Sequence, residues 1–286
     1  MGKIVIVGSG PAGCSAALYA ARAGQEVVVI SMGMGALSKA ELIQNYYGFE
    51  EGITGAELYR QGVAGAKAVG AEFITAEVVG LDYTGSLVVQ TTEGDYPADA
   101  VILATGAGRI APKIAGLAEH EGRGVSYCAT CDAFFYRGKT AAVLGSGEYA
   151  LHEVQALLPL AGRVILCTNG GPLTADFPEG VEICTEKLAA VEGEEKVSAL
   201  RLENGELLPV EGLFVALGVA GSAALARKLG APVENGRIVV DERMQTGIPG
   251  LYAAGDCTGG LLQVCKAVYE GALAATEAIK QIRGKK

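Results

Sequence analysis

Two cysteines near the middle of the chain have the spacing at which sulfur carries out redox chemistry. Cys128 and Cys131 stand in the stretch "SYCATCDAFF", separated by two residues. A C-x-x-C pair brings two sulfurs within disulfide reach and tends to lower the pKa of one thiol, which favours the nucleophilic thiolate. Asp132 follows directly and is a candidate for the proton donor or acceptor that thiol–disulfide exchange needs. The sequence therefore predicts a redox centre built from Cys128, Cys131 and Asp132.

The chain has seven cysteines, and the remaining five are predicted to be small buried hydrophobes. They are scattered through apolar stretches at Cys14, Cys167, Cys184, Cys257 and Cys265. A structural zinc site needs a tetrahedral set of ligands, and the two histidines, His120 and His152, do not supply a Cys/His pair at ligand spacing. We therefore predict neither a metal site nor a disulfide scaffold.

A glycine-rich turn near residue 10 predicts a nucleotide site. The stretch "KIVIVGSGPAGCSAALYAARAGQEVVVIS" reads as strand, turn, helix and strand, and Gly8, Gly10 and Gly13 form G-x-G-x-x-G between the first strand and the helix. In that context the glycines permit a tight turn and let a pyrophosphate approach the N-terminus of the helix. The acid expected on the ribose about 20 residues later is missing, because Ser31 ends the second strand.

The same pattern returns later in the chain. "TAAVLGSGEYALHEVQALLPLAGRVILCT" carries Gly145, Gly147 and Ala150 at the corresponding places. Gly8 and Gly145 lie 137 residues apart (145 minus 8). A repeat of this length indicates two similar α/β units rather than one large one.

The repeat defines the predicted fold class and domains. Two further strands, at 101–107 and 213–219, match each other, and each follows hairpin-like pairs, of which the Asn204-Gly205 turn is the clearest. We predict an α/β protein of two Rossmann-like three-layer domains, the second inserted into the first. The predicted bounds are 1–112 and 243–286 for the first domain and 113–242 for the second.

The motifs together resemble one family. The first glycine turn, "CATCD", "ATG" and "LYAAGDC" occur in the order found in low-molecular-weight thioredoxin reductases, and the resemblance covers nearly the whole chain. It implies that the first domain holds FAD and that electrons pass from the flavin to the Cys128–Cys131 pair and on to thioredoxin. It also implies a homodimer. By resemblance, Cys131 lies nearer the flavin than Cys128 does.

The resemblance further implies which residues bind FAD. Asp256 would contact the ribityl chain, Gly255 would allow close approach of the backbone, and Asn45 stands in "QNYYG" where the family has Asn. The full implied set is Gly8, Gly10, Pro11, Ala12, Gly13, Asn45, Thr105, Gly106, Gly255, Asp256 and Gln263.

The chain departs from the family mainly on the nicotinamide side. Family members that use NADPH carry arginines after the second strand of the second domain, which grip the 2′-phosphate through bidentate charge. Here that segment reads "LCTNGGPLT", with no basic residue between Arg163 and Lys187. "GEYALHE" places Tyr149 where the nicotinamide ribose and phosphate would pass, and Leu262 precedes Gln263 where the family has Arg-Gln.

These departures resemble the ferredoxin-dependent flavin thioredoxin reductases, which keep the fold, FAD and the C-x-x-C pair but have lost nicotinamide binding. The resemblance implies that reduced ferredoxin is the electron donor. Ferredoxins are acidic and this chain carries a net charge of -9, so a local basic patch must override the overall repulsion. We hypothesise that ferredoxin docks on one of two basic segments, with ordinary solvated charge as the alternative. They are Arg109, Lys113, Arg123, Arg137 and Lys139, and the tail residues Lys280, Arg283, Lys285 and Lys286.

Two other functions stay open. One is an enzyme that uses NADH or NADPH through an altered second site, because the intact G-x-G-x-x-A turn still has the shape that holds a pyrophosphate. The glycines of that turn also serve strand–helix packing whether or not a ligand binds. The other is a flavin-bearing redox sensor without turnover, which failure to reduce any thioredoxin would favour.

Composition argues against several other classes of protein. The negative net charge disfavours a nucleic-acid binder, which needs a basic face against phosphate. No apolar run reaches the roughly 18 residues of a membrane span, and "MGKIVIVGSG" reads as a first strand rather than as a signal peptide. We therefore expect a cytoplasmic protein without membrane or nucleic-acid partners.

Overall fold

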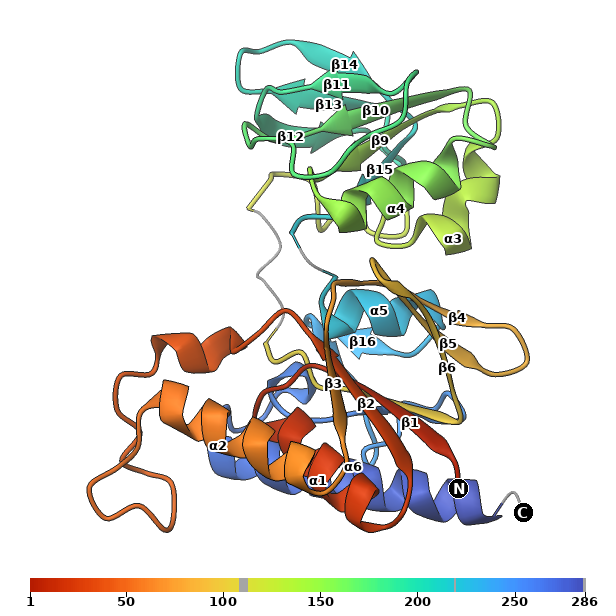
Figure 1. Cartoon of the computed structure of the whole chain (residues 1–286). Helices are drawn as coiled ribbons and strands as arrows, with labels where there is room; N and C mark the ends of the chain where they lie inside the picture. Colours follow the sequence, from red (N-terminus) through yellow and green to blue (C-terminus); the bar gives the residue numbers. More distant parts are fainter. Residues whose placement is uncertain (108–112, 219, 285–286) are drawn as a thin grey trace. The chain divides into compact units, whose positions relative to one another are not determined.

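The chain divides into two compact units. The computed structural model describes residues 1–107, 113–218 and 220–284 (Figure 1). Unit 1 comprises Met1–Arg109 and Gly221–Lys286, and unit 2 comprises Ile110–Ala220. The second unit is inserted into the first, as the sequence predicts for this α/β fold.

A five-stranded parallel sheet forms the centre of unit 1. Its order is β18-β7-β1-β2-β3, and every neighbouring pair runs parallel. These strands are β18 (Leu251–Ala253), β7 (Ala100–Leu103), β1 (Lys3–Val7), β2 (Glu26–Ser31) and β3 (Glu72–Thr75). The helices of the unit are α1 (Pro11–Arg22), α2 (Gly55–Ala68), α5 (Ser222–Lys228) and α6 (Val264–Gly284), with short turns η1 (Gly35–Lys39) and η3 (Asp256–Thr258).

Smaller antiparallel sheets complete unit 1 (Figure 1). They are the three-stranded β4 (Val78–Tyr83), β5 (Leu87–Thr91) and β6 (Gly94–Ala98), and the hairpin β16 (Val233–Glu234) and β17 (Arg237–Ile238).

The core of unit 1 is built from the apolar side chains of its parallel strands. Nearly every residue of β1 is buried, as is typical of a parallel strand covered on both faces. Ile4 and Ile6 point to one face, where they join a cluster with alanines of α1 and α6. Small side chains such as Ala16 and Ala274 let these two helices pack closely against each other. The glycine turn after β1 is therefore held between a rigid sheet and a closely packed helix pair.

Unit 2 repeats the plan on a smaller scale. Its five-stranded sheet has the order β11-β10-β9-β15-β8, again with parallel pairs throughout. These strands are β11 (Glu182–Cys184), β10 (Arg163–Cys167), β9 (Thr140–Leu144), β15 (Gly212–Val215) and β8 (Val125–Ser126). A three-stranded antiparallel sheet comprises β12 (Leu188–Glu192), β13 (Ala199–Leu202) and β14 (Leu207–Pro209). The helical segments are α3 (Ala129–Asp132), η2 (Ala133–Tyr136) and α4 (Glu148–Leu157).

The hairpin predicted at Asn204-Gly205 is present between β13 and β14. Gly205 N donates to Leu202 O at 3.0 Å, and Asn204 Oδ1 accepts from Glu206 N at 2.9 Å. The strands predicted at 101–107 and 213–219 are shorter than expected, since β7 and β15 end at Leu103 and Val215. Residue 219 lies outside the described residues.

The second chain crossing lies earlier than predicted. The chain returns to unit 1 between Ala220 and Gly221, not between residues 242 and 243. The reason is α5, which packs against β4 of unit 1 and whose first residue, Ser222, bonds to Thr105 with 2.6 Å between the hydroxyl oxygens. The first crossing, predicted between residues 112 and 113, falls between Arg109 and Ile110, in the stretch 108–112 that the structure does not describe.

Within the described residues, no helix combines the length and the apolar character that a bilayer crossing requires.

Candidate functional site

The two cysteines of the predicted redox centre form a disulfide at the start of a short helix in unit 2. Cys128 and Cys131 are joined, with 5.4 Å between their Cα atoms. Cys128 has extended backbone and precedes α3, and its sulfur accepts a hydrogen bond from Cys131 N at 3.1 Å. Cys131 is exposed, whereas Cys128 is only 4% exposed. The two sulfurs therefore differ in access to a partner.

Asp132 is tied to this turn through a serine that the sequence did not single out. Ser126 Oγ donates to Asp132 Oδ2 at 2.7 Å and accepts from Cys128 N at 3.1 Å. Burial and the negative charge of Asp132 both raise the pKa of the Tyr136 hydroxyl. The structure thus brings together Cys128, Cys131 and Asp132, with the carboxylate held by Ser126 beneath the turn.

A buried carboxylate on α4 is a second group that the sequence did not reveal. Glu153 is 1% exposed, and it accepts a hydrogen bond from Ala129 N at the start of α3. Its other oxygen lies 3.3 Å from His152 Nδ1. The available signal was its place on the apolar stripe of the helix, one turn after Tyr149 and one turn before Leu157. Glu153 fixes the N-terminus of the helix that carries the disulfide.

Tyr149 is buried in unit 2. It is 2% exposed, and its hydroxyl donates to Tyr127 O at 2.9 Å, in the segment that leads into the disulfide. The phenol therefore supports the redox turn, and its place in the path of a nicotinamide stays a prediction.

Two exposed aromatic rings follow the disulfide a few residues later in the chain. Phe134 and Phe135 are 68% and 66% exposed, and their rings meet edge to face at 6.3 Å. The Arg137 guanidinium lies 5.5 Å from the centre of the Phe134 ring. Large apolar side chains exposed as a pair beside a reactive group are typical of a docking surface.

Ten of the eleven residues implied for FAD line one cavity of unit 1. The cavity has a volume of about 470 Å³. The ten residues are Gly8, Gly10, Pro11, Ala12, Asn45, Thr105, Gly106, Gly255, Asp256 and Gln263. Gly13 does not line it. A Cβ at Gly13 would lie 1.9 Å from Gly8 O, so this position has no room for a side chain. Gly13 thus serves the close packing of α1 on the turn rather than the cavity itself.

The other two glycines of the turn have different tasks. Gly8 has φ +110°, and a Cβ there would lie 2.3 Å from Ala104 O, so it allows β1 and the end of β7 to approach. At Gly10 a Cβ would meet nothing within 4 Å. Gly10 precedes α1 without a side-chain cap. The cavity therefore adjoins a helix N-terminus whose first N–H groups have no capping side chain.

Hydrogen bonds join two predicted residues, Asn45 and Thr105, to partners far away in the sequence. Asn45 Nδ2 donates to Gln263 Oε1 at 2.9 Å, although 218 residues separate them. Thr105 Oγ1 accepts from Ser222 N at 2.9 Å at the start of α5. Each pair fixes a side of the cavity.

Ser31, which stands where an acid was expected, belongs to a group of hydroxyls. Ser9 Oγ lies 2.7 Å from Ser31 Oγ and 3.1 Å from the hydroxyl of Tyr59. Cys14 lies behind the same turn, where its thiol donates to Ser9 O at 3.1 Å and burial raises its pKa to about 12. Neutral donors and acceptors thus replace the acidic group at the end of β2.

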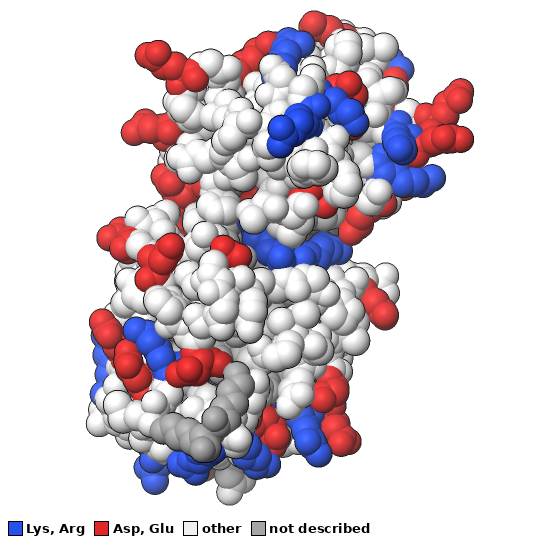
Figure 2. Space-filling model, turned by 90° about the vertical axis from the view of Figure 1, so that its right-hand side faces the viewer, with Lys and Arg blue, Asp and Glu red and all other residues white. Residues whose placement is uncertain are grey.

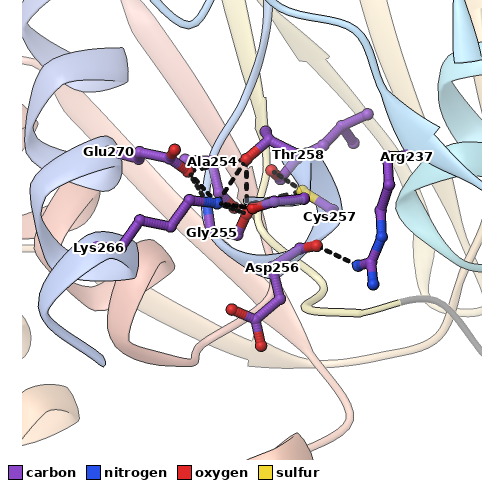
Figure 3. Close-up of polar contacts among 10 residues, drawn as sticks. Arg237, Ala254, Gly255, Asp256, Cys257, Thr258, Lys266 and Glu270 are labelled. Carbon is purple, nitrogen blue, oxygen red and sulfur yellow. Dashed lines mark hydrogen bonds and ion pairs between the residues drawn. The ribbon is translucent and has the colours of Figure 1, made fainter. Parts of the chain in front are cut away.

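A buried ion pair on α6 holds the loop that carries Gly255 (Figure 3). Lys266 Nζ lies 3.0 Å from Glu270 Oε2, and the two side chains are 15% and 11% exposed. Lys266 donates to the carbonyls of Gly255 and Gly259 at 2.8 and 2.5 Å. Glu270 accepts from Gly255 N at 2.8 Å and from Thr258 Oγ1 at 2.9 Å. The pair therefore satisfies the polar groups of this loop in a place with little access to water.

The same loop presents Asp256 to the cavity. In Figure 3 the Asp256 carboxylate points away from Lys266 and Glu270, while Arg237 donates to its backbone carbonyl. Asp256 lines the cavity. Lys266, Glu270 and Arg237 thus fix the backbone and leave the carboxylate for a ligand.

The second glycine turn, in unit 2, is contacted by the segment that follows β10. Gly145 repeats the task of Gly8, since a Cβ there would lie 2.2 Å from Ala216 O. Gly147 differs from Gly10, because Thr174 Oγ1 lies 3.0 Å from its Cβ position. Thr174 N also donates to Ser146 O at 2.8 Å. The segment after β10 therefore contacts the turn.

The surroundings of this second turn are acidic. A cavity of about 430 Å³ is lined by Glu148, Leu173, Thr174, Ala175, Asp176, Phe177 and Ile183. Its described lining thus includes two carboxylates and no basic side chain. One cation comes close elsewhere, since the Lys187 Cγ atom lies 3.1 Å from the Cβ position of Gly170.

The sequence matches the family model of pyridine nucleotide-disulphide oxidoreductases over residues 2–271. A thioredoxin reductase from Aquifex aeolicus (strain VF5) is 35% identical over an alignment of 307 positions, which covers 99% of this chain and 94% of that protein. The chain belongs to the low-molecular-weight thioredoxin reductase family.

Two solved structures of this family resemble the chain over nearly its full length. The atypical thioredoxin reductase TRi from Desulfovibrio vulgaris Hildenborough is 40% identical, with 99% of both chains covered and a TM-score of 0.93. A ferredoxin-flavin thioredoxin reductase from Clostridium acetobutylicum is 35% identical, with 99% of this chain and 98% of that chain covered and a TM-score of 0.75.

Membership of the thioredoxin reductase family implies a flavoprotein, and the cavity of unit 1 fits FAD. It combines open space at Gly10, an uncapped helix N-terminus for a pyrophosphate and a carboxylate at Asp256 for hydroxyl groups. Its wall also includes apolar side chains such as Leu37 and Ile43, which suit a flat ring system.

Both predicted basic segments include exposed cations with partners. Lys113, Arg123, Arg137 and Lys139 are exposed on unit 2, where Arg123 donates to Glu119 O and Arg137 lies over the Phe134 ring. In the tail, Lys280 is paired with Glu277 at 2.6 Å and Arg283 donates to Ala23 O. Arg109, Lys285 and Lys286 lie outside the described residues. On the face drawn in Figure 2, cations are interspersed with acids on both units.

Proposed function

We propose that this protein is a flavin-dependent thioredoxin reductase that takes its electrons from reduced ferredoxin. The observation that carries the choice of donor is the state of the two glycine turns. The first turn opens on a cavity of about 470 Å³, whereas Thr174 contacts the second turn and the described lining of the cavity beside it holds Glu148 and Asp176 without a basic side chain. The likeness to a ferredoxin-flavin thioredoxin reductase supports the same choice.

The FAD site in this proposal is the cavity of unit 1. Gly10 and the first turn of α1 receive the pyrophosphate, and Asp256 accepts hydrogen bonds from hydroxyl groups of the ribityl chain. Asn45 and Gln263, already bonded to each other, close the side of the cavity. Bound there, FAD would collect single electrons from ferredoxin and supply two of them to a disulfide.

Thioredoxin is reduced by disulfide exchange at Cys128 and Cys131. One thiolate of the reduced pair attacks a sulfur of the thioredoxin disulfide and forms a mixed disulfide, while the other thioredoxin sulfur leaves as a thiolate. The second cysteine of the pair then attacks the mixed disulfide, which releases reduced thioredoxin and restores the Cys128–Cys131 bond. Asp132, held by Ser126, exchanges protons with the sulfurs.

Thioredoxin docks on the aromatic pair that follows the disulfide. Phe134 and Phe135 offer an exposed apolar surface within a few residues of Cys131. An apolar contact near the reacting sulfurs positions the partner disulfide without depending on salt.

Ferredoxin docks on the exposed cations of unit 2, which include Lys113, Arg123, Arg137 and Lys139. The tail is the weaker candidate because Glu277 neutralises Lys280. Exposed cations attract an acidic partner locally even when the net charge of the whole chain is negative.

The protein is proposed to act as a homodimer in the cytoplasm. Thiol-based electron transfer of this kind belongs to a reducing compartment.

A nicotinamide-dependent reductase is the second candidate, and one observation favours it. The Lys187 side chain runs beside Gly170, just after β10, where a 2′-phosphate would need a positive charge. Such an enzyme would have to move Thr174 away from Ser146 before a pyrophosphate could bind.

Turnover with different donors tests the proposal. The purified protein is supplied with thioredoxin and with NADPH, NADH or enzymatically reduced ferredoxin under anaerobic conditions, and thioredoxin thiols are counted. We expect thiols to appear with ferredoxin alone. Turnover with either nicotinamide would replace the proposal by the second candidate, and no thiols with any donor would favour a redox sensor.

A further inference from the structure

Two cysteines outside the redox centre lie side by side in unit 2. Cys167 is the last residue of β10 and Cys184 is the last residue of β11, and the register of these parallel strands pairs them directly. The sequence separates them by 17 residues (184 minus 167), so no motif announces the pair.

The geometry of the strands brings the two sulfurs together. Neighbouring strands lie about 4.8 Å apart, and disulfide-bonded residues have Cα atoms about 4.4 to 6.8 Å apart. Paired residues of parallel strands point to the same face of the sheet, and Cys184 packs against the apolar cluster that contains Cys167. Burial raises the pKa of the Cys167 thiol, and the proximity of Cys184 raises it further.

Backbone hydrogen bonds keep the pair aligned beyond the strands. Thr168 N donates to Cys184 O at 2.9 Å, and Gly170 N donates to Thr185 O at 2.9 Å. The strand β11 is only three residues long and lies at the edge of the sheet. A short edge strand can move the small distance that a sulfur–sulfur bond requires.

The two thiols differ in access. Cys167 is 0% exposed, whereas Cys184 is half-buried and follows the exposed Ile183. An oxidant in solution therefore reaches Cys184 first, and the buried thiol is protected from direct attack.

We propose that Cys167 and Cys184 form a second, reversible disulfide, separate from Cys128–Cys131, when the protein meets a peroxide. The Cys184 thiolate attacks one oxygen of hydrogen peroxide, which gives a sulfenic acid and releases water after protonation. Cys167 attacks that sulfur, loses its proton and displaces a second water. In total, two thiols are oxidised by two electrons and one peroxide is reduced to two waters.

The disulfide would tie the end of β10 to the edge strand. The segment that it encloses includes Thr174, which contacts the second glycine turn. Oxidation therefore restrains this segment, and a dithiol reductant frees it.

The sequence makes the test simple, because both cysteines fall in one tryptic peptide. No Lys or Arg lies between Arg163 and Lys187, so trypsin releases residues 164–187 intact. The reduced, folded holoprotein is treated with a small excess of hydrogen peroxide, then denatured and its free thiols blocked with N-ethylmaleimide without reduction. Mass spectrometry counts the labels on this peptide.

We expect the peptide to carry two labels before oxidation and none afterwards, with a mass lower by two hydrogens. Cleavage before Asp176 should leave its two halves linked, and dithiothreitol should restore both labels. Cys265, a free and exposed cysteine, is the internal control and should be oxidised without entering this peptide's crosslink.

Variants of each cysteine separate the proposed steps. In Cys167→Ala the peptide should carry an oxidised Cys184 and no internal bond. In Cys184→Ala, which changes the more exposed member, Cys167 should keep its label. The proposal is overturned if the wild-type peptide still carries two labels when Cys265 has been fully oxidised, or if Cys184 is found bonded to another cysteine.

Discussion

The two glycine turns have nearly the same local structure and opposite surroundings. Gly8 and Gly145 each allow a strand to approach the next strand end, with a Cβ position 2.3 and 2.2 Å from a carbonyl oxygen. Two residues later in each turn the surroundings differ, because a Cβ at Gly10 would meet open space and a Cβ at Gly147 would meet Thr174. The turn itself therefore reflects a shared fold, and the two units differ in the segment that follows the second strand.

The two turns also differ in the acidic side chains around them. The first turn of α1 carries no acidic residue, whereas α4 begins with Glu148 and the adjacent cavity adds Asp176. A carboxylate at a helix N-terminus satisfies the helix dipole that a pyrophosphate would otherwise use. The N-terminus of α1 thus remains available to an anion, whereas the N-terminus of α4 already has carboxylates beside it.

The largest effect on thioredoxin reduction should come from the two disulfide-bonded cysteines. Cys128→Ser or Cys131→Ser removes one of the two sulfurs that exchange requires, so thioredoxin reduction should fall by more than about 10³-fold. FAD content should not change, because the FAD cavity lies in unit 1. The flavin absorbance of the purified variant and a thiol-release assay measure the two quantities, with Cys265→Ser as control. Residual turnover above one tenth of wild type in either variant would rule out the exchange mechanism.

Matched substitutions at Gly10 and Gly147 test most directly whether the two turns differ in flavin binding. Gly10→Val fills the open approach at the cavity, so the dissociation constant for FAD should rise about 100-fold, or about 2.7 kcal/mol. Gly147→Val touches Thr174 and should change FAD affinity by less than about 2-fold. Flavin fluorescence titration of both apoproteins gives the two constants. Equal losses of affinity would mean that the second turn also binds the flavin.

The ion pair behind the Gly255 loop should matter for stability. Glu270→Gln leaves the Lys266 ammonium in a buried place without its partner, so the free energy of unfolding should fall by about 2–4 kcal/mol. The exposed pair of Lys3 and Glu26 offers the control, and Glu26→Gln should cost less than about 0.5 kcal/mol. Denaturant titration of the holoproteins compares the two. Similar losses would show that Lys266 and Glu270 act as an ordinary surface pair.

The smallest effect concerns the donor. Lys113→Glu reverses one exposed charge on unit 2, so the KM for ferredoxin should rise by about 3- to 10-fold at low ionic strength, with the KM for thioredoxin unchanged. Lys280→Glu, in the tail, should leave both values unchanged. Steady-state assays at two salt concentrations are sufficient. An effect of the tail variant alone would move the docking surface to unit 1.

Local patterns predicted the parts of the molecule that depend on neighbours in sequence. The two strand–turn–helix–strand repeats, the Asn204-Gly205 hairpin and the Cys128–Cys131 disulfide all follow from spacing within a few residues. The insertion of one unit into the other follows from the repeat.

Contacts between distant segments were not accessible in the same way. Asn45 and Gln263 meet across 218 residues, and Cys167 and Cys184 meet only because β10 and β11 pair in register. The second domain boundary was misplaced because nothing in the sequence around α5 shows that Ser222 bonds to Thr105. In each case the missing information is tertiary packing, which no single stretch of sequence contains.

Anaerobic reduction of the bound flavin tests the central contrast between the two turns most directly. The FAD-loaded protein is mixed in turn with NADPH, NADH and enzymatically reduced ferredoxin, while the visible absorption of the flavin is followed. If the second turn is closed, ferredoxin alone should bleach the flavin. Rapid bleaching by either nicotinamide would contradict this account and would assign a working nucleotide site to unit 2.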